Sequence, residues 1–246
     1  MQSGMRAITI KSAWNGHSDC EGCSIRQSVL FADLVEADFA LLHEQIDDLD
    51  YPSSAVIYHA GAHGDWLFTL RAGAIKLVRY SNDGNQRILR VLRPGDVCGL
   101  EALVRPGYDH TAITLAPTKI CRIPRALIER LNRETPRLQK PLFEHWYAAL
   151  AEADAWLAEL AAGHADVKTR VARLLLRLRT DEAPGRAIRL SLEDIGAILG
   201  VAPESASRAL GLLRRSNLLS DADSRYHWRI DASGLAALLA AHDQEN

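Results

Sequence analysis

The sequence lacks long apolar runs and has no excess of charge of either sign. No run approaches the roughly 18 to 20 apolar residues that cross a bilayer, and the N-terminal stretch has no signal-peptide hydrophobic region. We therefore expect a cytoplasmic protein with no membrane partner. Of 246 residues, 29 are Lys or Arg and 31 are Asp or Glu, a net charge of −2. This balance alone gives little support for a nucleic-acid partner.

The charge is also nearly even along the chain. From His164 onward there are 12 Lys and Arg against 11 Asp and Glu. Any case for DNA binding therefore rests on a motif and on single arginines, of which Arg208, Arg214, Arg215 and Arg225 stand out. Hydrophobic residues make up 48% of the chain, enough for an ordinary core.

A βαβ setting is missing around the one Cys-x-x-Cys motif, Cys20 to Cys23, which precedes the first recognisable strand or helix. Thiol-disulfide enzymes place that motif in such a setting. We expect no enzymatic activity.

Two short helices joined by a tight turn are predicted between residues 191 and 215. Ser191 caps the first helix, acidic residues occupy its first turn, and Gly200 ends it. Pro203 suits the first turn of the second helix. On that helix Glu204, Ser207 and Arg208 share a polar face. The residues expected to pack beneath it are Ala206, Leu210, Leu212 and Leu213. This arrangement is typical of a helix-turn-helix that reads the major groove.

These residues resemble the recognition element of the Crp/Fnr family of bacterial transcription regulators, and the resemblance extends over nearly the whole chain. In that family the glutamate accepts from cytosine and the arginine donates to guanine, which implies these roles for Glu204 and Arg208. Ser207 stands where cAMP-type members carry Gly, and it resembles the Fnr-type reading of a TTGAT-like half-site. The resemblance implies double-stranded DNA, a second copy of the chain and RNA polymerase as partners.

The first half of the chain is predicted to form strands joined by regularly spaced turns. Gly73, Gly84 and Gly95 fall 11 residues apart, and Asp83-Gly84 between two β-rich segments is a strong hairpin signal. The segment resembles the β-roll sensor domain of the same family. The expected fold class is therefore α+β: a jelly-roll sensor, a long dimerisation helix and a C-terminal winged helix-turn-helix. The wing is expected in residues 217–230, with its turn at 221–224.

A long helix is predicted after the roll. Phe143, Trp146, Leu150, Ala153, Leu157 and Leu160 advance in steps of three and four, as the seam of a coiled coil does. Pro136 and Pro141 are expected to bracket its start. The alternative is a helix that packs on its own domain; the resemblance favours a dimer. We expect the domains at 1–29 (cysteine segment), 30–135 (roll), 136–163 (dimerisation helix) and 164–246 (DNA-binding domain).

The sensor resembles cyclic-nucleotide domains but departs from their phosphate-binding pattern. The Arg-Ser or Arg-Thr pair of cAMP-binding members falls at His110-Thr111 here. A phosphate would lose its charge-assisted, bidentate partner. A cyclic nucleotide is therefore the less favoured effector.

The cysteines suggest another kind of sensor than one that binds a cyclic nucleotide. There are four of them: Cys20, Cys23, Cys98 and Cys121. Cluster-binding Fnr proteins begin with a similar Cys-x-x-Cys-Ser-Ile string and place a further ligand in a segment that residues 119–124 resemble. The resemblance implies a 4Fe-4S cluster that senses oxygen, nitric oxide or redox state. The chain departs from the pattern at Val29, where those proteins carry another cysteine.

Three accounts follow from this departure. In the preferred one Cys98 replaces the missing ligand, so that Cys20, Cys23, Cys98 and Cys121 bind the cluster. In the second, Asp19, His17, a water or a small ligand completes a site of three cysteines. In the third there is no cluster: the Cys20–Cys23 pair forms a dithiol switch, a zinc half-site or a haem-proximal ligand, and Cys98 is a small buried side chain.

Overall fold

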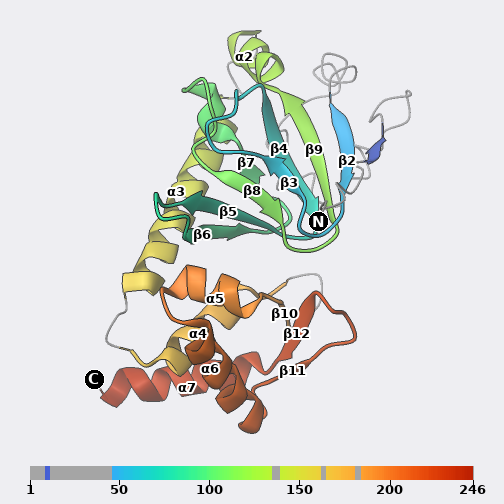
Figure 1. Cartoon of the computed structure of the whole chain (residues 1–246). Helices are drawn as coiled ribbons and strands as arrows, with labels where there is room; N and C mark the ends of the chain where they lie inside the picture. The colour runs from blue at the N-terminus through green and yellow to red at the C-terminus, as the bar shows by residue number, and fades with distance from the viewer. Residues whose placement is uncertain (1–8, 12–45, 135–138, 162–164, 181–183, 246) are drawn as a thin grey trace. The chain divides into compact units, whose positions relative to one another are not determined.

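A computed structural model of the chain describes residues 9–11, 46–134, 139–161, 165–180 and 184–245 (Figure 1). The chain divides into two compact units. Met1–Arg79 and Val91–Glu152 form the first, and Tyr80–Arg90 and Ala153–Asn246 form the second. Among the described residues, no helix is long and apolar enough to span a membrane.

Two sheets make up the roll, and their strands belong to the first unit except for the end of β5 and most of β6. The first has the order β1 (Thr9–Lys11), β2 (Asp47–Tyr51), β9 (Thr118–Pro124), β4 (Trp66–Ala72) and β7 (Val97–Cys98). The second has the order β3 (Val56–Tyr58), β8 (Thr111–Thr114), β5 (Ile75–Tyr80) and β6 (Gln86–Leu92). All pairings given for these strands are antiparallel, as Figure 1 illustrates for β4 and β9. The predicted α+β fold with an N-terminal roll is confirmed.

The glycines expected at the corners have the backbone that corners require. Gly73, Gly84 and Gly95 have φ of 92°, 81° and 97°. At Gly73 an added Cβ would lie 2.6 Å from the carbonyl oxygen of Pro117, so no larger residue fits without a shift. The Asp83 carboxylate accepts from the Asn85 backbone N–H at 3.2 Å and orders the predicted hairpin turn.

The inner faces of the strands form the main core of the roll. Leu49, Leu70 and Ile120 stand in register on β2, β4 and β9 and are at most 2% exposed. Tyr58, Phe68 and Tyr108 fill the interior. The Tyr58 and Tyr108 rings stack at a centroid distance of 3.9 Å. Aromatic side chains therefore occupy much of the space enclosed by the sheets.

A second core lies on the outer face of the five-stranded sheet. It contains Leu67 of β4, Ile123 of β9 and residues of the 3-10 turn η2 (Leu100–Leu103). Residues of the two helices that follow β9 also belong to it or pack against it. These helices are α2 (Arg125–Glu134) and α3 (Gln139–Ala161). Trp146 of α3 packs against this core.

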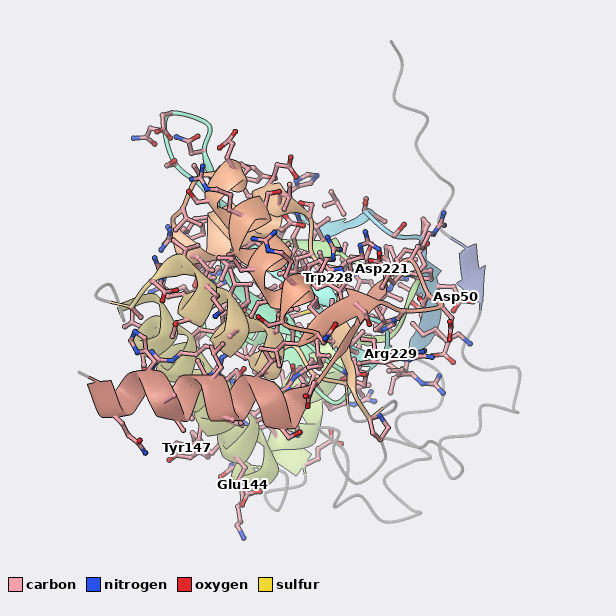
Figure 2. All side chains as sticks on the ribbon, turned by 90° about the horizontal axis from the view of Figure 1, so that it is seen from below. Asp50, Glu144, Tyr147, Asp221, Trp228 and Arg229 are labelled. Carbon is pink, nitrogen blue, oxygen red and sulfur yellow. The ribbon has the colours of Figure 1, made fainter. Side chains whose placement is uncertain are left out.

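The packing of α3 corrects two expectations. Pro141 lies inside α3, as its third residue, and a proline is tolerated there because the first N–H groups of a helix have no intrahelical acceptor. Trp146 faces its own domain and is not part of the exposed seam. Among the described side chains, the large hydrophobics that α3 leaves exposed are Phe143, Tyr147, Leu150 and Leu157, at 65%, 72%, 61% and 64%. Figure 2 shows Tyr147 and Glu144 projecting outward from this helix.

The second unit contains four helices and a small sheet in the described part of the chain. The helices are α4 (Val167–Arg177), α5 (Leu192–Leu199), α6 (Pro203–Arg215) and α7 (Ala232–Glu245). The sheet has the order β10 (Arg186–Ile188), β12 (His227–Ile230) and β11 (Leu219–Asp221). The β11–β12 hairpin is the predicted wing, with its turn within residues 222–226. The buried core of the second unit includes Val171, Ile195, Leu213, Trp228 and Leu235.

Candidate DNA interface and cysteine site

Helix α5 begins and ends where the sequence predicts. The Ser191 hydroxyl accepts the backbone N–H of Asp194 at 3.0 Å. Gly200 ends the helix with φ 64°, in the left-handed conformation. Gly196 lets the chain turn closely, because a Cβ there would lie 2.7 Å from the carbonyl oxygen of Val201. The turn between the two helices is therefore set by local chemistry.

Helix α6 presents the predicted reading face to solvent. Pro203 occupies its first position, and Glu204, Ser207 and Arg208 are exposed. The opposite face packs into the domain through Ala206, Ala209, Leu210 and Leu213. Leu212 was expected to pack with them, but it is 42% exposed because it lies on the Arg208 side, four residues further along the helix.

A contact not predicted from the sequence holds Arg208. Its Nη2 donates to the Ser205 hydroxyl at 3.0 Å. The donor and acceptor are three residues apart, so they lie on the same side of α6. Ser205 thus limits the rotamers of the exposed guanidinium beside Glu204 and Ser207, and the three predicted DNA contacts form one surface.

Two aspartates organise the arginines of the wing. The Asp221 carboxylate accepts from Arg189 and from Arg214, the latter in the last turn of α6, both at 3.3 Å. Asp223 pairs with Arg186 and Arg229 at 3.7 and 3.8 Å. Figure 2 labels Asp221, Trp228 and Arg229 on the wing strands. Arg214 is therefore tied to the wing and does not stand alone at the end of the recognition helix.

Cys121 lies on the outer face of the five-stranded sheet and is half-buried. In register, Lys11 of β1 pairs with Asp48 of β2, Asp48 with Cys121 of β9, and Cys121 with Thr69 of β4. The Cys121 thiol lies 3.6 Å from Asp48 Oδ1. Arg71 donates to both oxygens of that carboxylate, at 2.6 and 2.5 Å. Cys121 is thus an accessible thiol in a polar setting.

Cys98 lies on the opposite face of the same sheet. It pairs with Phe68 of β4, whereas Cys121 pairs with the next residue, Thr69. Paired residues share a face and successive residues alternate, so the two thiols point away from each other. Cys98 is 3% exposed within the roll core. Burial, and next the neighbouring Cys98, raise the pKa of Tyr58 well above its usual range.

The strand register therefore argues against the preferred four-cysteine site. Ligands of one cluster must point into the same space, and strand β4 separates Cys98 from Cys121. No group of three or more His, Cys, Asp or Glu side chains within the described residues is arranged to bind a metal ion. Cys20, Cys23 and the alternative ligands His17 and Asp19 lie outside the described residues.

Two protein-family models match parts of the chain. Residues 49–134 match the cyclic nucleotide-binding domain, and residues 169–238 match the Crp-like helix-turn-helix domain. The first match covers the roll, and the second covers the helices and wing just described. The chain belongs to the Crp/Fnr family of transcription regulators. It is thus a DNA-binding transcription regulator, and its exposed Glu204–Arg208 surface belongs to a Crp-like helix-turn-helix.

Relatives within the family have differing names. The chain is 27% identical over 215 residues to an anaerobic regulatory protein of Pasteurella multocida, covering 82% of this chain and 76% of that one. It is 24% identical over 237 residues to the transcriptional activator Anr of Pseudomonas aeruginosa, covering 94% and 97%. A CRP-like cAMP-activated global regulator of Mycobacterium tuberculosis is 26% identical, covering 79% and 93%. The structure of FixK2 from Bradyrhizobium japonicum shares the fold, with a TM-score of 0.67 at 24% identity, covering 78% and 96%.

The roll of this Crp/Fnr regulator is poorly suited to a cyclic phosphate at the expected pair. His110 Nδ1 lies 3.7 Å from Glu101 Oε1, and the Glu101 carboxylate also accepts the Asp109 backbone N–H at 3.3 Å. The Thr111 hydroxyl accepts the backbone N–H of Ala60 at 3.1 Å. A carboxylate beside this pair repels an anion, and His110 stands at the position where the resemblance places the arginine of cAMP-binding members. The geometry supports the sequence-based argument against a cyclic nucleotide.

Proposed function

We propose that this regulator acts as a homodimer, senses oxygen, nitric oxide or redox state through a cysteine-ligated iron–sulfur cluster, and binds a TTGAT-like palindrome. The anaerobic regulators among its relatives and the accessible Cys121 thiol support the sensing step. The exposed Glu204, Ser207 and Arg208 support the reading of DNA.

The observation that carries the proposal is the strand register around Cys121. Strand β1 ends at Lys11, and β2 begins at Asp47. Lys11, Asp48 and Cys121 stand in one row across three neighbouring strands. Lys11 is thus about 10 Å from Cys121 at the usual strand spacing. Both ends of the segment that carries Cys20 and Cys23 are therefore close to the Cys121 thiol.

The reach of that segment is sufficient for a shared site. Cys20 follows Lys11 by nine residues, which extend up to about 30 Å. The residues present thus fit a site in which Cys20, Cys23 and Cys121 hold the cluster and a non-cysteine group completes it. Asp19, His17, a water or a small ligand remains the candidate for that fourth position. Such a cluster, when bound, supplies thiolate-held iron that reacts with oxygen or nitric oxide.

The cysteine site is linked to α3 through the outer face of the sheet. Ile123 follows Cys121 by two residues on β9, so both side chains lie on the outer face. Ile123 belongs to the second core, against which Leu142, Trp146 and Ala149 of α3 pack. Ligation that draws the N-terminal segment onto Cys121 can therefore alter how α3 presents Phe143, Leu150 and Leu157 to a second copy.

The exposed apolar stripe of α3 supports dimerisation. Phe143, Leu150 and Leu157 recur every seven residues and are each more than 60% exposed. Pairing with a second copy would bury them, and it would present two recognition helices to the two halves of a palindrome. A change of about 2.7 kcal/mol in this association shifts its constant a hundredfold, enough to switch DNA binding.

The experiment that tests the proposal is DNA binding with and without oxygen. Protein purified anaerobically is titrated onto a labelled TTGAT palindrome and onto a scrambled duplex, and fluorescence anisotropy is recorded. We expect tight, specific binding that weakens at least tenfold after exposure to air. Arg208→Ala is the matched control, which should lose about 1 to 3 kcal/mol of binding to the palindrome in both states. Equal affinity before and after air would contradict redox sensing, and equal affinity for both duplexes would contradict the proposed site.

A further inference from the structure

The tip of the wing is an ordered turn that projects one arginine. The Ser224 hydroxyl accepts the Tyr226 backbone N–H at 3.2 Å, and the Ser224 carbonyl accepts the His227 N–H at 3.2 Å. The Tyr226 carbonyl accepts the backbone N–H of Arg189 at 2.8 Å. Both neighbours of Arg225 are thus fixed by hydrogen bonds, while Arg225 itself is exposed.

The guanidinium of Arg225 is also held in place. Its Nη2 donates to the Tyr226 hydroxyl at 2.6 Å, and its Cζ lies 4.9 Å from the centre of the Tyr226 ring. Contact with an aromatic ring leaves the charge of an arginine in place while restricting its rotamers. A group ordered in this way loses less conformational entropy when it binds.

Arg225 differs in this from the other arginines around the wing. Arg189 and Arg214 share the carboxylate of Asp221, and Arg186 and Arg229 share that of Asp223. Arg225 instead contacts Tyr226, which carries no negative charge to offset that of the guanidinium. The wing therefore presents a preorganised positive charge at its tip.

The wing begins at the far end of α6, beyond the turn from which the predicted base contacts come. Base contacts come from Glu204 and Arg208 near the start of the helix, and α6 extends about 20 Å over its 13 residues. The wing follows the far end of α6, where the Leu218 N–H donates to the Leu213 carbonyl at 3.0 Å. A major groove is about 12 Å wide, so a helix that reads it leaves DNA beside the half-site within reach of the wing.

We propose that Arg225 enters the minor groove of the DNA that flanks each half-site and makes the regulator prefer A·T-rich flanks. Narrow A·T minor grooves have an enhanced negative potential that attracts an inserted guanidinium. The inference rests on the DNA-binding function of the domain and adds a determinant of sequence preference outside the predicted TTGAT-like core. Tyr226 is the positioning residue in this account.

The test selects binding sites from a library of random duplexes. The wild type and the variants Arg225→Ala, Arg225→Lys and Arg229→Ala are compared, each used as full-length protein purified anaerobically. Arg229→Ala is the matched control, because Arg229 lies on the same wing and pairs with Asp223. We expect wild-type and Arg229→Ala sites to carry A·T-rich flanks, and Arg225→Ala and Arg225→Lys sites to carry random flanks around the same core.

Affinities for two duplexes then measure the preference. The duplexes share the selected core and differ only in A-tract or G·C flanks. The wild type should favour the A-tract flanks by about fivefold or more, the low end of what one lost DNA contact costs. Arg225→Lys retains a charge for phosphate but not the weakly hydrated guanidinium, so it should lose the preference at a nearly unchanged salt dependence. Tyr226→Phe should reduce the preference in part.

Several outcomes overturn the inference. Equal weakening of Arg225→Ala on both flanks would show a phosphate contact only, and an unchanged preference would show that Arg225 does not read the flank. Wild-type sites without flank enrichment would also refute it. The identity of the selected core tests the proposed TTGAT-like recognition separately, since flank enrichment is scored around whatever core emerges.

Discussion

Replacing Cys98 with Ala should destabilise the roll without removing iron. The side chain is 3% exposed on the inner face of the sheet. Removing its one sulfur atom resembles deleting a buried methyl group, which costs about 1 to 1.5 kcal/mol. For the first unit, whose segments Met1–Arg79 and Val91–Glu152 total 141 residues, each kcal/mol lowers the midpoint of thermal unfolding by roughly 3 to 4 °C.

The matched variant Cys121→Ala should behave in the opposite way. Cys121 is half-buried on the outer face, so its loss should change the unfolding midpoint little while iron content falls to background. Thermal unfolding is followed by circular dichroism on the iron-free proteins. Visible absorption and iron per chain are measured on anaerobic preparations. Loss of iron in Cys98→Ala to the same extent as in Cys121→Ala would refute the assignment of the two thiols to separate faces.

Three further perturbations test other parts of the account. Arg208→Ala should cost about 1 to 3 kcal/mol on a TTGAT palindrome and little on unrelated DNA in anisotropy titrations; equal weakening on both would mean that Arg208 contacts phosphate only. Leu157→Glu, at a side chain that is 64% exposed, should leave folding intact but yield monomers at micromolar concentration in sedimentation, because it opposes like charges across the two-fold axis; persistent dimers would place the interface elsewhere. Burial raises the pKa of Glu101, but the nearby His110 and the backbone N–H groups outweigh it, so the pKa lies below the usual 4.5. A depressed carboxyl pKa contributes stability above pH 4.5 that is lost as the pH falls through the lower folded value, so Glu101→Gln should flatten the acid limb of the stability curve; an unchanged limb would show that the interaction contributes nothing.

The helix-turn-helix could be predicted from sequence because its signals are local. The Ser191 cap, the Gly200 stop and the Pro203 start each act within one turn of a helix, and the structure confirms all three. The corners of the roll were predictable for the same reason, since positive φ at Gly73 and Gly95 is a property of single residues. Leu212 was misplaced because a run of leucines fits both the buried face and the exposed one.

The cysteine site could not be predicted in the same way. The faces of Cys98 and Cys121 depend on how β7 and β9 pair with β4, and a shift of one residue in either pairing would reverse the result. Trp146 was misassigned because α3 carries apolar residues on two adjacent stripes, and its partner core comes from strands far away in sequence. Contacts of Arg208 with Ser205 and of Arg214 with Asp221 depend on rotamers that spacing alone does not determine.

The most direct test of the central claim is the metal content of the wild-type protein and Cys121→Ala, both purified without oxygen. We expect a coloured wild-type protein with iron and acid-labile sulfide in equal amounts, about four of each per chain, and a colourless Cys121→Ala. A wild-type protein that contains neither iron nor sulfide, or a Cys121→Ala that keeps both, would contradict the proposed cluster.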